Sequence, residues 1–195
     1  MKKILLLFML AITLVACSNT NTATKEENSN QATNSQETSS EKTIKVGIIQ
    51  FAQHIALDRT REGFIEELEN LGYKVEEETV NVNSDISLIP STAKKFQADG
   101  VDVIYAIATP CAQGAKNAVQ DIPIIFNAVT DPLSAGLVES NEAPGANVTG
   151  VSDHYPIADQ LDKFLEVFPE KKKLGVLYST GEANSEAQIL SLIHI

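Results

Sequence analysis

Residues 101–119 read VDVIYAIATPCAQGAKNAV, and an apolar first half leads directly into a helix-forming second half. The first eight residues are almost all apolar, which is typical of a strand buried on both faces of a parallel sheet. Thr109 and Pro110 follow at once, and these residue types are favoured at the N-cap and the first position of a helix. We therefore predict a strand over 101–108 and a helix that is capped by Thr109 and ends near Val119.

Strand-like and helix-like segments alternate on both sides of this unit. Apolar or alternating runs predict strands, in chain order, at 44–49, 74–82, 101–108, 123–127 and 147–152. Apolar residues at helical spacing predict helices between them at 58–71, 84–98 and 109–119. We expect Asp58 to cap the first helix, and Pro90 either to bend the second or to mark its true first turn. The alternation favours an α/β fold, a doubly wound lobe with helices on both faces of a parallel sheet.

A second unit of the same kind is expected after Pro156. An amphipathic helix is followed by a predicted strand at 174–178, and another helix begins within 181–185. We therefore expect a first α/β lobe at 43–153 and the beginning of a second, similar lobe at 154–189.

Residues 1–16 have the features of a bacterial lipoprotein signal peptide. Two lysines precede an apolar run that is shorter than the roughly 20 residues a membrane-spanning helix needs. The run ends in Leu-Val-Ala before Cys17, which resembles the lipobox, where the cysteine thiol receives diacylglycerol. Residues 17–42 are too polar to bury a core, so we expect a lipidated, disordered tether. These features predict a lipid-anchored protein on the extracytoplasmic face of the cell membrane; the alternative is an ordinary secretory signal with an incidental cysteine.

Charge and motif content exclude several classes of function. The formal net charge of −11 argues against a nucleic-acid partner, because no basic stripe could neutralise phosphates. With Cys17 taken by lipid, Cys111 is left alone, so neither an intramolecular disulfide nor a cysteine-based zinc site is expected. His54 and His154 lack the spacing of metal ligands. The common hydrolase, zinc-protease, phosphate-loop and dinucleotide motifs are also missing, so we expect no catalytic residue, metal or cofactor.

Polar residues follow several of the predicted strands. Ligands of open α/β sheets bind beyond the carboxyl ends of the strands, so these positions are candidate binding residues. Free N–H groups at the helix start beside Thr109 would favour a carboxylate. An ammonium group could be met by Asp131, Asp153 or Glu182, and the two demands together describe an amino acid. The alternative is that Thr109 is only a helix cap, and that Asp131 and Asn184 serve only in turns or caps.

Five blocks of the sequence, taken in order, carry a resemblance to a known family. These blocks are 46–64 (VGIIQFAQHIALDRTREGF), 107–113 (IATPCAQ), 126–137 (FNAVTDPLSAGL), 147–153 (NVTGVSD) and 175–185 (GVLYSTGEANS). Together they resemble the substrate-binding proteins of ABC transporters, of the type often assigned to tryptophan or tyrosine uptake. The resemblance implies a two-lobed protein of the type I periplasmic-binding class, which holds a small amino acid between its lobes and passes it to a permease. By family position, the cleft is lined by His54, Thr109, Gln113, Thr130, Asp131, Ser152, Asp153, Glu182, Asn184 and Ser185. The chain departs from the family pattern at Ile55, Pro90 and Cys111.

The resemblance fades after Gln188, whereas family members continue. Residues 190–195 resemble translated sequencing-adapter DNA, so we expect a non-native tail and an incomplete second lobe. Such a lobe would expose an apolar face, and we expect an aggregation-prone or partly disordered segment after residue 155. Two other functions stay open: a lipid-anchored ligand sensor that partners a membrane signalling protein, and an exported hydrolase, for which no nucleophile with a positioned base is visible.

Overall fold

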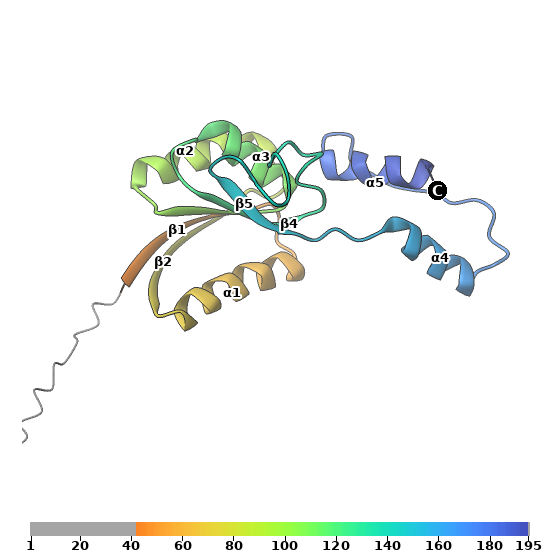
Figure 1. The fold of residues 1–195 in the computed structure, drawn as a ribbon, viewed down its shortest axis with the longest axis horizontal. Helices are drawn as coiled ribbons and strands as arrows, with labels where there is room; N and C mark the ends of the chain where they lie inside the picture. Colours follow the sequence, from red (N-terminus) through yellow and green to blue (C-terminus); the bar gives the residue numbers. More distant parts are fainter. Residues whose placement is uncertain (1–41, 195) are drawn as a thin grey trace, which may run out of the picture. The chain divides into compact units, whose positions relative to one another are not determined.

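The computed structural model describes residues 42–194, which belong to one compact unit. The predicted signal peptide, Cys17 and the tether up to residue 41 lie outside the described residues. A parallel sheet with the strand order β2-β1-β3-β4-β5 forms the centre of this unit (Figure 1). Its strands are β1 (Lys42–Gln50), β2 (Tyr73–Asn81), β3 (Val103–Ile107), β4 (Ile124–Val129) and β5 (Val148–Ser152). The predicted α/β class and the predicted strands of the first lobe are confirmed.

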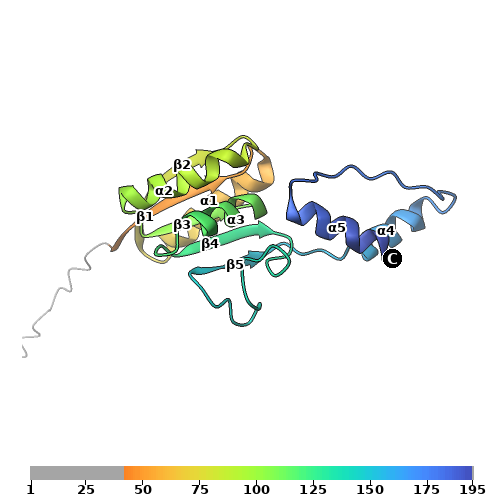
Figure 2. The same ribbon diagram turned by 90° about the horizontal axis from the view of Figure 1, so that it is seen from above.

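Helices cover both faces of the sheet. One face carries α1, and the other carries α2 and α3 (Figures 1 and 2). These helices are α1 (Ile55–Asn70), α2 (Ile89–Asp99), which follows a short 3-10 turn at Ile86–Leu88, and α3 (Thr109–Ala118). Because each face has its own helices, the buried side chains form two clusters, one on either side of the sheet.

Strand β1 lies inside the sheet and contributes to both clusters. Val46 and Ile48 belong to the cluster on the α1 face, whereas Ile49 belongs to the cluster under α2 and α3. This alternation follows from the two-residue period of a strand. At Gly47 the ring of Phe96 from α2 occupies the space that a β-carbon would need. The missing side chain therefore lets α2 pack directly onto the strand.

The predicted N-cap of the first helix is wrong. Helix α1 begins earlier, at Ile55, and Nδ1 of His54 accepts a hydrogen bond from the Ala56 amide (3.2 Å). Asp58 lies inside the first turn, where its carboxylate accepts a hydrogen bond from the side-chain amide of Gln50 (2.7 Å). A carboxylate that is held by the buried end of β1 is not available to cap the helix.

The predicted N-cap of the third helix is also wrong by one position. Ala108 holds the N-cap position, no side chain caps the helix, and Thr109 is its first residue. The Ala108 amide still donates to the Asn127 carbonyl (2.9 Å), so the chain leaves the sheet only at Ala108, with a φ of 84°. For the second helix, Pro90 lies in the first turn of α2, which is one of the two predicted alternatives.

Two helices follow the sheet, α4 (Ile157–Val167) and α5 (Ala183–Ile193), and they contact each other. The strand predicted at 174–178 is wrong, because residues 171–179 have no regular secondary structure. An extended segment becomes a strand only when its backbone pairs with a neighbour, and among residues 42–194 this segment pairs with none. Across the same described range, no helix combines the length and the apolar character needed to span a membrane.

Candidate functional site

The predicted binding residues of the first lobe lie along one edge of the sheet, where its parallel strands end. Gln50 is in register with Ile107, and Ile107 with Asn127, so the segments after β1, β3 and β4 start side by side. The Ser152 hydroxyl donates to the Thr130 carbonyl (3.0 Å), which joins the segment after β5 to the segment after β4. This is the sheet edge at which open α/β folds bind ligands.

A cavity of about 280 Å³ lies beside the ends of β4 and β5. This volume is near the lower end of the range of small-molecule sites, roughly 300–1,000 Å³. Thr130 and Asp131 line it, together with residues 154–158, which include the start of α4. Helix α5 supplies the remaining lining residues, Ala187, Gln188 and Ser191. The cavity therefore combines two predicted binding residues with the N-terminal turn of α4 and one face of α5.

The other predicted binding residues do not line this cavity. These residues are His54, Thr109, Gln113, Ser152, Asp153, Glu182, Asn184 and Ser185. In the sequence, Ser152 and Asp153 come directly before residues 154–158, which line the cavity. The Ser152 hydroxyl accepts a hydrogen bond from the His154 amide (3.1 Å), and the Asp153 amide donates to the Val129 carbonyl (3.1 Å). These bonds fix the path of the chain from β5 to the cavity.

Asp131 is an ionised cap on the rim of the cavity. Its Oδ1 accepts hydrogen bonds from the amides of Leu133 and Ser134 (3.0 Å each), and its Oδ2 accepts one from the Ser134 hydroxyl. The hydrogen bonds from Ser134 are the main reason why the pKa of this carboxyl is below its usual range. The cap chemistry predicted as an alternative is therefore present, and the cap carries a negative charge at neutral pH beside the cavity.

Thr109 and Gln113 lie on α3, on the side of the sheet that holds the cluster under α2 and α3. Thr109 is buried, and the Gln113 side-chain amide donates to the Ala135 carbonyl (2.9 Å). Ala108, directly before α3, has a positive φ of 84°. Ala128, near the end of β4, has a positive φ of 54°. Positive φ is unfavourable for alanine, and such strained positions concentrate at ligand-binding sites.

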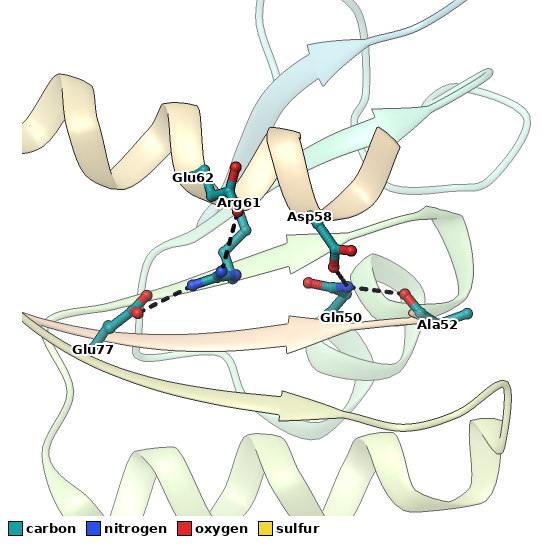
Figure 3. Close-up of polar contacts among 6 residues, drawn as sticks. All are labelled: Gln50, Ala52, Asp58, Arg61, Glu62 and Glu77. Atoms are coloured by element: carbon teal, nitrogen blue, oxygen red, sulfur yellow. Dashed lines mark hydrogen bonds and ion pairs between the residues drawn. The ribbon is translucent and has the colours of Figure 1, made fainter. Parts of the chain in front are cut away.

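Gln50, which was not among the predicted binding residues, holds the loop that carries His54. This side chain is only 3% exposed, and its amide donates to the Ala52 carbonyl (2.9 Å) and to Asp58 (2.7 Å), as Figure 3 shows. Gln50 thus fixes the start of the loop that carries His54, which is exposed. In the sequence, the feature that could have identified Gln50 is its position as a polar residue directly after the apolar run of the first predicted strand.

Glu182, Asn184 and Ser185 lie together at the start of α5. Glu182 holds the N-cap position without a side-chain cap bond. The Oδ1 atom of Asn184 is buried and has no hydrogen-bond partner among the described residues. Buried polar atoms are nearly always paired, so this oxygen marks a position where a hydrogen-bond donor from outside the described residues would fit.

Comparison with known proteins identifies the family. Residues 45–195 match the family described as ABC transporter substrate binding protein. The chain is 42% identical over 199 residues to a tyrosine-binding protein from Clostridioides difficile, and the alignment covers 98% of this chain and 56% of that protein.

Solved structures give the same result. A conserved domain protein from Vibrio cholerae has a TM-score of 0.74 and 38% identity, with 78% of this chain and 54% of that chain covered. A Streptococcus pneumoniae ABC domain in complex with L-Trp has a TM-score of 0.73 and 40% identity, covering 76% and 51%. A ligand-free, open substrate-binding protein with adhesive properties from Clostridium difficile has a TM-score of 0.62 and 44% identity, covering 77% and 52%. The chain thus spans about half the length of the relatives it matches, and it belongs to the ABC transporter substrate-binding protein family.

Proposed function

We propose that this protein is an extracytoplasmic binding protein that captures an aromatic amino acid and delivers it to an ABC permease. Family membership supports the binding role. The ligand class is supported by relatives described as tyrosine-binding or as a complex with L-Trp. The observation in the structure that carries the proposal is the cavity at the ends of β4 and β5, with Asp131 on its rim.

The cavity offers complementary groups for the two charged ends of an amino acid. Asp131 is held ionised and would attract the ammonium group. The first N–H groups of a helix have no intrahelical partner and favour anions, so the start of α4 at Ile157 and Ala158 would attract the carboxylate. Tyr155 and Pro156 add apolar surface for an aromatic side chain.

The remaining predicted residues belong to the same proposed site. We assign 43–153 to a first lobe and the residues from 154 onward to a second, with the ligand held between them. In this arrangement the loops after β1 and β3 and the start of α5 approach the ligand when the lobes close, a hinge motion. The buried, unpaired Oδ1 of Asn184 would then accept a hydrogen bond from the ligand or from the opposing lobe.

Lipid attachment at Cys17 is the second part of the proposal. A lipid at this position, followed by a polar tether to residue 42, would keep the binding lobes close to a permease. Tethering raises the effective concentration of one partner at the other, and it does so without new contacts.

The binding proposal is tested with the chain that lacks residues 1–17. It contains no tryptophan, so the fluorescence of added L-Trp reports only on the ligand. We expect a saturable change in this fluorescence, and we expect L-Tyr to compete for the site whereas L-Leu does not. If circular dichroism shows a folded chain and neither L-Trp nor L-Tyr binds saturably, the proposed function is wrong.

A further inference from the structure

Residues 131–137 form a single helical turn that is closed at both ends. Asp131 caps the start, as described above. At the other end, the Leu137 amide donates to the Pro132 carbonyl (2.9 Å) and the Gly136 amide to the Leu133 carbonyl (2.8 Å). This pair of bonds, with Gly136 at a φ of 66°, is the Schellman motif that ends many helices. The rim residue Asp131 and the buried Leu137 are therefore opposite ends of one small structural unit.

Helix α3 holds the far end of this turn by two side chains. Three consecutive carbonyls, those of residues 135–137, point toward α3. The Gln113 amide donates to the carbonyl of Ala135 (2.9 Å), and the Lys116 ammonium donates to those of Gly136 (2.6 Å) and Leu137 (3.1 Å). Gln113 and Lys116 are three residues apart, so they lie on one side of the helix.

The Lys116 ammonium is well suited to this position. The carbonyls at the end of a helical turn carry partial negative charge, and a cation there is favourable. Among the described residues Lys116 forms no ion pair with an acid, so its charge is matched by these carbonyls alone. Lys116 is only partly exposed and does not line the cavity.

We infer that Lys116 is a positioning residue of the binding site, which acts through the 131–137 turn without touching the ligand. By holding the turn at its carbonyl end, Lys116 keeps Asp131 in a fixed place on the cavity rim. Ligand affinity is then coupled to a side chain of α3 that contacts the opposite end of the turn. The inference rests on the proposed function, because the coupling concerns the ligand that Asp131 would meet.

The test compares three variants of the chain that lacks residues 1–17. Lys116→Met keeps the aliphatic stem but removes the charge, Lys116→Arg keeps the charge, and Lys94→Met removes an exposed lysine from α2 as the matched control. In Lys116→Met without ligand, we expect the Gly136 and Leu137 amides to exchange with solvent about tenfold faster. We expect L-Trp affinity to fall by about fivefold, which is less than the roughly tenfold or greater loss of a direct hydrogen bond to a charged group, because Lys116 acts on the ligand only through the turn. Lys116→Arg should keep both values near those of the unmodified chain, and Lys94→Met should change neither.

Each alternative result has a defined meaning. If Lys116→Met matches Lys94→Met in exchange and in affinity, or if exchange rises while affinity is unchanged, the inference is overturned. A lower thermal midpoint for Lys116→Met together with unchanged affinity would indicate a purely structural role and would also overturn the inference. If the unmodified chain binds neither L-Trp nor L-Tyr, the proposed function fails; the amide exchange of the variants then still decides whether Lys116 holds the turn.

Discussion

Two glycines in regular secondary structure, Gly47 and Gly63, have opposite surroundings. A β-carbon at Gly47 in β1 would overlap the Phe96 ring, whereas one at Gly63 in α1 would meet nothing within 4 Å. We expect Gly47→Ala to lower the free energy of unfolding by about 1–3 kcal/mol, the usual cost of overpacking a core. Gly63→Ala should raise it by about 0.5–1 kcal/mol, because alanine favours a helix. Urea denaturation of both variants measures the two changes, and equal effects would contradict this account of β1.

Asp131 has two roles, as cap and as charge, and two substitutions separate them. Asparagine is as good an N-cap as aspartate, so Asp131→Asn should leave the stability within about 0.5 kcal/mol of wild type, whereas Asp131→Ala should cost about 1 kcal/mol. Both variants remove the charge, and we expect both to weaken L-Trp binding about tenfold, which equals about 1.4 kcal/mol. Calorimetric titration measures the binding. Undiminished affinity in Asp131→Asn would exclude a contact between this carboxylate and the ligand.

The lowered pKa of Asp131 also predicts a pH dependence. The ionised cap stabilises the fold above the ordinary carboxyl pKa of about 3.9, and this contribution is lost as the pH falls through the lower pKa of the folded state. The stability difference between wild type and Asp131→Ala should therefore be constant at neutral pH and shrink in acid. Chemical denaturation at several pH values measures it, and a difference that grows in acid would contradict the sign of the shift.

Cys111 is completely buried on α3, and burial raises the pKa of its thiol to about 12. Because the thiolate is the reactive form, this thiol should be inert toward a disulfide reagent at mildly alkaline pH. In the chain without residues 1–17 it is the only cysteine, so the reagent counts it alone. We expect no reaction in the native protein and complete reaction in denaturant. Fast reaction of the native protein would show that α3 opens readily.

At the scale of elements, hydrophobic patterning predicted the strands of the first lobe. The buried strand β3 has a continuous apolar run, whereas the mostly exposed edge strand β2 was predicted from its alternating pattern. The helix starts were predicted less well. Aspartate is a preferred N-cap residue and histidine is not, so residue type alone favoured Asp58, whereas in the structure the His54 ring accepts the hydrogen bond from the Ala56 amide. The strand at 174–178 failed for a similar reason, since its apolar pattern says nothing about whether a neighbouring strand is present.

The unpaired segment at 171–179 predicts where the folded chain is weakest. Lys171, Lys172 and Lys173 are exposed and lie outside regular structure, whereas Arg61 and Lys116 lie within helices that pack on the sheet. Within residues 42–194, we therefore expect trypsin to cut first at 171–173. Mass spectrometry of a short digest identifies the site. Earlier cleavage within 55–118 would show that the sheet lobe is less stable than the segment after it.

For the whole molecule, the candidate site was only partly predictable. The carboxyl ends of parallel strands meet at one edge, so the sequence alone predicted that the residues after β4 and β5 lie together at that edge, as they do in the structure. The hydrogen bonds that hold the turn after β4 could not be predicted from the sequence, because Lys116 and Gln113 are far in sequence from the carbonyls that they contact. Hydrogen bonds from long side chains to distant backbone atoms leave no periodic pattern.

Lipid anchoring is a prediction about the whole protein in its cell. If Cys17 carries the lipid, Cys17→Ser should move the protein from the membrane fraction to the soluble fraction and abolish labelling by a lipid precursor. Ser18→Ala is a matched control at the neighbouring position. If Cys17→Ser stays in the same fraction as the unmodified protein, an ordinary secretory signal becomes the better interpretation of residues 1–16.

The strand order has a consequence for secretion. Each strand after β1 joins an edge that earlier strands have already formed, since β2 and β3 flank β1, β4 joins β3, and β5 joins β4. A polypeptide that crosses a membrane unfolded and amino-terminus first can thus extend this sheet strand by strand as it emerges from the translocation channel. Among residues 42–194, the last strand of the sheet ends at Ser152, so all five strands emerge before α4 and α5. If the chain is exported in this way, folding proceeds in the direction of export, and the core around the sheet forms before α4 and α5 emerge.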